Sequence, residues 1–155
     1  MHFSVATAAA IVALLPSSAL AVGGAYVQNK CSFPVYLWSV GSSVGPKQVL
    51  APNSGYGEPL HRDPTTGGIA IKLTTVDDGL YLPNVPQTVF SYSLDNALVW
   101  YDLSDVFGDA FAGHPLQIKT NDDTCGAISW PNGVPAGSHP TPCSSNANVV
   151  FTLCA

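Results

Sequence analysis

Hydrophobic and polar residues alternate in several short stretches of this chain, as they do in β-strands with one buried face. Over 98–103 the alternation places Leu98, Trp100 and Asp102 on one face of a strand and Val99 and Tyr101 on the other. No stretch sustains the 3.6-residue period of an amphipathic helix. The expected strands cover 25–30, 33–40, 48–51, 68–74, 87–94, 97–103, 115–120 and 148–154.

Segments rich in glycine, proline, asparagine and serine separate these strands and predict turns. The Asp95-Asn96 pair joins two of the strands into an expected hairpin. The segments predicted to be irregular are 56–67, 76–86 and 121–145. We find neither an internal repeat nor a linker. The pattern therefore predicts a single all-β domain, an antiparallel β-sandwich of about eight to ten short strands.

The N-terminal segment has the pattern of a secretory signal peptide. An apolar run covers 5–15 and is too short to span a bilayer as a helix. Ala19-Leu20-Ala21 then gives a small-x-small cleavage pattern. We predict cleavage after Ala21, so that 1–21 is the signal peptide and 22–155 is the secreted domain; the alternative is a buried N-terminal helix. No later stretch is long and apolar enough for a membrane span.

Composition narrows the range of partners. The formal net charge is −5, and Lys and Arg together number 5. Nucleic acid and anionic membrane are bound through clusters of positive charge, which this chain lacks, so neither is an expected partner. Neutral or cationic partners, polysaccharide among them, are compatible with this charge, and we expect a monomer without a cofactor.

Four cysteines follow the predicted cleavage site, and an even number in an oxidising compartment indicates two disulfides. Three connectivities are possible. We favour Cys31–Cys154 with Cys125–Cys143, because the first pair would tie the chain ends together and the second would close a local loop. The longer loop is the one from which a disulfide removes more entropy in the unfolded chain.

Three blocks of the chain together resemble one protein family. Residues 27–38 are similar to an opening strand pair with the pattern N-x-C-x-x-x-V-W. Residues 88–115, centred on 100–108, are similar to the signature Y-D-V/I-S-x-V-x-G-F-N-x-P. Residues 142–154 are similar to a closing C-x-S-S followed by V-x-F-C. In this order the blocks resemble thaumatin-like proteins, and most closely the small secreted fungal branch of Bys (Blastomyces yeast-phase-specific) and antigenic thaumatin-like proteins.

The resemblance implies a thaumatin-like β-sandwich with two disulfides. In the family the first and last cysteines pair, and the cysteine after the signature strand pairs with that of the closing block. This implies Cys31–Cys154 and Cys125–Cys143. Larger members carry disulfide-rich subdomains between the positions of Cys125 and Cys143, where this chain has seventeen residues. The resemblance therefore implies the sandwich alone.

The larger thaumatin-like proteins have an acidic cleft implicated in glucan binding and sometimes in weak glucanase activity. Only part of it carries over: Asp102 matches the first signature aspartate, but Phe107 replaces the second. The cleft glutamate falls near Ser91 and the cleft arginine near Lys72. Glycoside hydrolysis needs two carboxyl groups about 5 to 10 Å apart, and Asp102 is the one catalytic candidate. The possible second carboxyl groups are those of Asp105, Asp109, Glu58 and Asp63.

Asp102 has a second interpretation, as a turn cap or as an acceptor of hydrogen bonds from Ser104 and nearby backbone. Trp38 and Trp100 lie within strong strands and are predicted to be core residues. The candidates for ligand binding are the cleft residues Asp102, Asp105 and Lys72 and three aromatic residues in expected loops, Tyr56, Tyr81 and Trp130.

These observations together predict a secreted, non-enzymatic protein that acts at or near the fungal cell wall as a glucan-binding, antigenic or host-interaction factor. Its partner would be β-glucan or a host or cell-surface protein. The alternatives are a weak β-1,3-glucanase with an acidic cleft around Asp102, and an antifungal protein of the defence type. No metal site is predicted, because His61, His114 and His139 lie in separate loops without the spacing of metal ligands.

Overall fold

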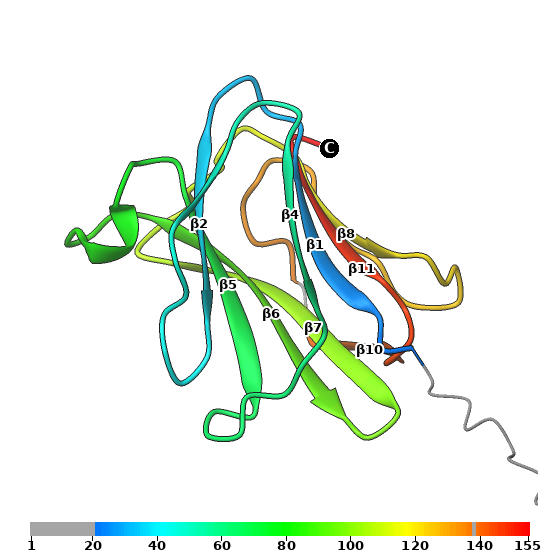
Figure 1. Cartoon of the computed structure of the whole chain (residues 1–155). Helices are drawn as coiled ribbons and strands as arrows, with labels where there is room; N and C mark the ends of the chain where they lie inside the picture. The colour runs from blue at the N-terminus through cyan, green and yellow to red at the C-terminus, as the bar shows by residue number, and fades with distance from the viewer. Residues whose placement is uncertain (1–20, 138) are drawn as a thin grey trace, which may run out of the picture.

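Two β-sheets packed face to face make up the protein in the computed structural model, which describes residues 21–137 and 139–155 (Figure 1). The predicted signal peptide lies outside the described residues, apart from Ala21. The five-stranded sheet has the order β4-β1-β11-β8-β9, and the six-stranded sheet has the order β10-β7-β6-β5-β2-β3. The elements are β1 (Gly24–Asn29), β2 (Val35–Val40), β3 (Gln48–Leu50), β4 (Gly55–Pro59), β5 (Gly68–Thr74), the 3-10 helix η1 (Gly79–Tyr81), β6 (Gln87–Asp95), β7 (Leu98–Val106), β8 (Leu116–Thr120), β9 (Ile128–Trp130), β10 (Thr141–Ser144) and β11 (Val149–Leu153).

The first and last strands are neighbours inside the five-stranded sheet. β1 and β11 pair in parallel, with Ala25 opposite Val149 and Asn29 opposite Leu153. In Figure 1 the blue β1 and the red β11 run side by side. Every other strand pairing among the described residues is antiparallel. The predicted sandwich is confirmed, with one parallel pair added to the antiparallel arrangement.

Alternate residues of the strands fill the space between the sheets. In the five-stranded sheet Val27, Phe151 and Ile118 form one row across β1, β11 and β8, and all three are fully buried. Phe90 of the six-stranded sheet is also fully buried, and its ring centre lies 5.7 Å from that of Phe151. Removing these apolar side chains from water is the main force that holds the sheets together.

Both predicted disulfides are present. Cys31–Cys154 joins the residues just beyond the ends of β1 and β11, with the Cα atoms 5.1 Å apart. Cys125–Cys143 joins the loop after β8 to the edge strand β10, with the Cα atoms 5.4 Å apart. The long-range disulfide therefore locks the parallel strand pair, and the short-range one anchors an edge.

Three strands lie in segments that the sequence pattern predicted to be irregular, and all three are at sheet edges. They are β4, β9 and β10. An edge strand needs hydrogen bonds on one side only, so it tolerates glycine and proline. Gly55, Gly57 and Pro59 obscure the alternation of β4, and Pro142 lies within β10. β9 has three residues, which are too few to reveal a period.

Candidate functional site

A groove with a volume of about 710 Å³ lies on the outer face of the six-stranded sheet. The strand register places Ala70, Ser91 and Asp102 in one row across β5, β6 and β7. The next row contains Ser93 and Trp100. Small side chains on the two middle strands leave the groove hollow, so Asp102 and the more exposed Trp100 on β7 form one of its walls.

Asp102 is a partly buried member of the groove lining, and it lies within β7 rather than at its end. It therefore caps no turn, so the turn-capping half of its second interpretation is wrong. Its Oδ1 atom is buried and accepts no hydrogen bond. A buried acceptor without a donor costs about 1–3 kcal/mol.

Two basic residues also line the groove. Lys72 comes from β5, and among the described residues it forms no ion pair. Arg62 comes from the loop after β4, and its Nη1 donates a hydrogen bond of 3.3 Å to the carbonyl oxygen of Leu94. The sequence pattern did not identify Arg62, because nothing local relates this loop residue to the sheet. The groove thus brings together the carboxylate of Asp102, the basic side chains of Lys72 and Arg62, and the aromatic ring of Trp100.

A second acidic residue of the groove stands far from Asp102. Within the described part of the chain, Asp95 is the other acidic residue in the lining. Asp95 lies opposite Leu98 of β7. Leu98 is four residues from Asp102 on the same strand, which separates their Cα atoms by about 13 Å at the rise of a β-strand. Glycoside hydrolases hold their two carboxyl groups about 5–10 Å apart. The backbone therefore does not place Asp95 at the spacing of a hydrolytic pair.

Asp63 lies behind one wall of the groove, with its carboxylate turned into the protein. Its Oδ2 accepts hydrogen bonds of 2.8 Å from both the backbone N–H and the hydroxyl of Ser42. Its Oδ1 accepts backbone N–H bonds from Thr65 and Thr66, at 2.9 and 2.8 Å. These bonds, with the backbone N–H of Ser42 first, hold the pKa of Asp63 well below its usual range. Asp63 therefore ties two loops together at the groove and is not available as an acid.

Glu58 lies between the sheets and accepts two tyrosine hydroxyls. Tyr56 donates to its Oε2 and Tyr92 to its Oε1, each at 2.6 Å. The hydroxyl of Tyr92 is also 3.1 Å from Nδ1 of His61. Burial, followed by the hydrogen bond to Glu58, raises the pKa of Tyr56 to about 12 and also raises that of Tyr92. This Glu58 cluster joins β4 to β6, and it places Glu58 and Tyr56 outside the groove lining.

Asp105 faces the interior at the far end of β7. The hydroxyl of Thr88 donates a 2.5 Å hydrogen bond to its Oδ1, while its Oδ2 is buried and accepts no bond. Burial raises the pKa of Asp105 to about 6; the Thr88 hydroxyl opposes this rise, and the neighbouring carboxyl of Asp109 adds to it. The carboxyl group of Asp109 thus affects the protonation of Asp105, and neither residue lines the groove.

The raised pKa of Asp105 predicts a pH-dependent loss of stability. The folded protein keeps the Asp105 proton up to about pH 6, whereas the unfolded chain releases it near pH 4. The contribution of this group is therefore full below about pH 4 and is lost as the pH rises through about 6. After a discount for solvent screening, we expect the free energy of unfolding to fall by about 1 kcal/mol relative to Asp105→Asn. Urea denaturation of both proteins between pH 4 and 7 measures this, and parallel pH profiles would contradict it.

The large aromatic side chains divide into buried and exposed ones differently from the prediction. Trp38 is buried as expected, and the exposed Tyr81 packs edge-on against it from outside the groove. Trp100, a predicted core residue, is 37% exposed and lines the groove. Trp130, a predicted exposed loop residue, is fully buried on β9. The alternation had placed Trp100 on the same face as Asp102, and that was the signal for its exposure.

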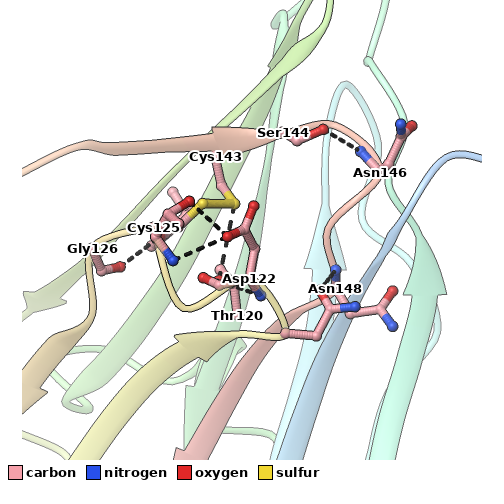
Figure 2. Close-up of a disulfide and its surroundings, with 11 residues drawn as sticks. Thr120, Asp122, Cys125, Gly126, Cys143, Ser144, Asn146 and Asn148 are labelled. Carbon is pink, nitrogen blue, oxygen red and sulfur yellow. Dashed lines mark hydrogen bonds between the residues drawn. A yellow bond between two sulfur atoms is a disulfide. The ribbon is translucent and has the colours of Figure 1, made fainter.

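One group of metal-ligand atoms gathers outside the groove, around the shorter disulfide. Ligand atoms of Asp122, Cys125 and Cys143 lie within 4.8 Å of one another. Figure 2 shows Asp122 beside the sulfur–sulfur bond of the two cysteines. Both sulfurs are committed to this bond, and Oδ1 of Asp122 accepts hydrogen bonds from the backbone and hydroxyl of Thr124. The group is therefore a structural anchor for the loop.

The sequence matches the family model described as "Bys1: Blastomyces yeast-phase-specific protein" over residues 12–155. An antigenic thaumatin-like protein of Arthroderma benhamiae is 34% identical over 170 aligned positions, which cover 100% of this chain and 85% of that protein. The secreted thaumatin-like protein calA of Emericella nidulans is 29% identical over 164 positions, covering 97% of this chain and 91% of that protein.

Two solved structures share the fold. The protein elicitor MoHrip2 of Magnaporthe oryzae superimposes with a TM-score of 0.69 at 23% identity, covering 86% of this chain and 99% of its own. The thaumatin-like xylanase inhibitor TLXI superimposes with a TM-score of 0.57 at 15% identity, covering 84% and 99%. Among the described residues of this chain, no helix has the length and apolar character needed to cross a membrane.

Proposed function

This chain belongs to the Bys1 (Blastomyces yeast-phase-specific) family of thaumatin-like proteins, and on that premise we propose that it is a secreted protein that binds β-glucan at the fungal cell wall without cleaving it. The ligand lies in the groove of the six-stranded sheet. The observation that carries this proposal is a groove lined by the carboxylate residue Asp102 and by the exposed ring of Trp100.

The groove residues match the chemistry of an uncharged, hydroxyl-rich polymer. Trp100 offers an aromatic surface for the apolar face of a sugar ring. Asp102 accepts hydrogen bonds from sugar hydroxyls, and Lys72 and Arg62 donate them. The wide separation of Asp95 from Asp102 supports binding rather than hydrolysis.

Retention on insoluble β-1,3-glucan tests this proposal. We expect Trp100→Ala and Asp102→Asn each to weaken retention about tenfold, since a lost stacking surface or charge-assisted hydrogen bond is worth about 1.5 kcal/mol. Phe107→Ala is the matched control, because it removes an exposed ring that lies outside the groove. A depletion assay over a range of glucan concentrations gives the affinities.

Two outcomes contradict the proposal. Equal retention of all four proteins places the ligand elsewhere, and no retention of the unaltered protein favours a protein partner at the host or cell surface. Measurement of the reducing sugars released from the glucan, made in parallel, shows whether the protein cleaves it. Release that disappears in Asp102→Asn would establish the alternative, a weak β-1,3-glucanase.

A further inference from the structure

The outer face of the five-stranded sheet, on the opposite side of the sandwich from the groove, is almost free of charge. The register aligns one uncharged row across all five strands. At a strand spacing of about 4.8 Å this row is about 19 Å long. Its members are Gly55, Gln28, Thr152, Gln117 and Ser129. The adjacent row is Gly57, Tyr26, Val150 and Lys119, so the two rows contain one charged residue.

The ring of Tyr26 lies flat against this face. A Cβ atom at Gly24 would come within 2.6 Å of the ring, and one at Gly57 within 2.7 Å, so the ring covers the backbone of both glycines. The Tyr26 side of the sheet is nevertheless open, since the residue is 40% exposed. A hollow of about 250 Å³ lies beside the ring, lined among others by Gly57, Pro59 and Glu58, whose carboxylate is held by the hydroxyls of Tyr56 and Tyr92. The sheet thus presents one exposed aromatic ring that lies against its surface.

We propose that this Tyr26 face is a second carbohydrate-binding surface, which takes one extended chain of an uncharged polysaccharide. A flat exposed ring is complementary to the apolar face of a sugar. The amides of Gln28 and Gln117 and the hydroxyl of Thr152 both donate and accept hydrogen bonds, as sugar hydroxyls do. Because these groups recur at the strand spacing, a chain crossing the strands meets a polar side chain on β1, β11, β8 and β9, while Gly55 leaves the β4 end of the row open. Within the two rows of this face Lys119 is the one basic residue, which favours an uncharged polymer over a polyanion as the occupant.

The Tyr26 ring also has a structural effect, because an aromatic side chain that covers glycine on a neighbouring strand stabilises a sheet. Binding and stability must therefore be measured separately. Tyr26→Phe keeps the flat ring and serves as the matched control for Tyr26→Ala. Gln28→Glu adds a negative charge at an exposed position of the uncharged row, and it leaves the ring and the glycines unchanged.

The experiment uses the secreted domain with the groove disabled by Trp100→Ala and Asp102→Asn. Its retention is measured on insoluble β-1,3-glucan, cellulose and chitin, and thermal unfolding of each variant checks the fold. We expect retention on at least one polymer, a loss of about tenfold on adding Tyr26→Ala or Gln28→Glu, and no change on adding Tyr26→Phe. If Tyr26→Ala fails to fold, the retention of the Gln28→Glu variant alone tests the proposal.

Absence of retention on all three polymers would overturn the proposal, and so would retention that neither Tyr26→Ala nor Gln28→Glu reduces. The outcome is independent of the groove, because the groove is disabled in every protein compared. If the groove proves inactive in the unaltered domain, this face is still tested by the same variants. If both surfaces bind, their opposite positions allow one molecule to hold two polysaccharide chains, with the gain in avidity that two linked sites provide.

Discussion

Replacing Cys31 and Cys154 with serine is expected to lower the free energy of unfolding by about 4–5 kcal/mol. The disulfide connects residues 123 positions apart, and a loop of this length restricts the unfolded chain strongly. It also fastens the ends of β1 and β11, which are neighbours inside the five-stranded sheet. Guanidinium denaturation of the oxidised protein and of the variant measures the difference.

The second disulfide provides the comparison. Cys125 and Cys143 are 18 positions apart, so replacing both with serine is expected to cost about 3 kcal/mol. A loss from the Cys125–Cys143 variant that equals or exceeds that of the Cys31–Cys154 variant would show that chain entropy does not set the order.

Trp130→Ala is expected to destabilise the protein by about 3–5 kcal/mol, because it removes a fully buried side chain and leaves a cavity. Trp130 lies on β9 opposite Leu116 of β8, and both residues are fully buried. Urea denaturation measures the loss, with Trp100→Ala as the control. Trp100 is 37% exposed, and its replacement is expected to cost about 1 kcal/mol or less.

This comparison also tests the role of Trp130 as a ligand-binding candidate. A Trp130→Ala variant that keeps its stability but loses retention on glucan would contradict its place in the core. A variant that is destabilised and still retained at low temperature would agree with it. Retention should therefore be measured well below the midpoint of thermal unfolding.

The alternation of residues predicted the strands well and identified both faces of β7 correctly. It could not predict which outer faces are covered. Trp38 and Trp100 both lie on the outer face of the six-stranded sheet, as the pairing of Trp38 with Lys72 and of Trp100 with Ser93 shows. Tyr81, at the end of the 3-10 helix η1, packs over Trp38, whereas Trp100 stays exposed. A strand's own sequence carries no information about a loop that folds over it.

The groove was predictable in part. The resemblance identified Asp102 and Lys72, and both line the groove. The other candidate carboxylates were separated by contacts that join distant parts of the chain. Ser42 holds Asp63 from 21 residues away, and Tyr92 holds Glu58 from 34 residues away. These partners come together only when the strands and loops are assembled, so the local sequence pattern does not predict them.

The parallel pairing of β1 with β11 has a consequence for the order in which the chain can fold. β1 is the first strand to be synthesised and β11 is the last, so the centre of the five-stranded sheet must wait for the C-terminus. The hairpin of β6 and β7 has no such requirement, since its strands are adjacent in sequence. Contacts at this separation make folding slow. The thiol of Cys31 consequently stays without its native partner until residue 154 arrives, and it can meet Cys125 or Cys143 first. Correct folding is therefore expected to need β11 and Cys154, followed by exchange of any early disulfide.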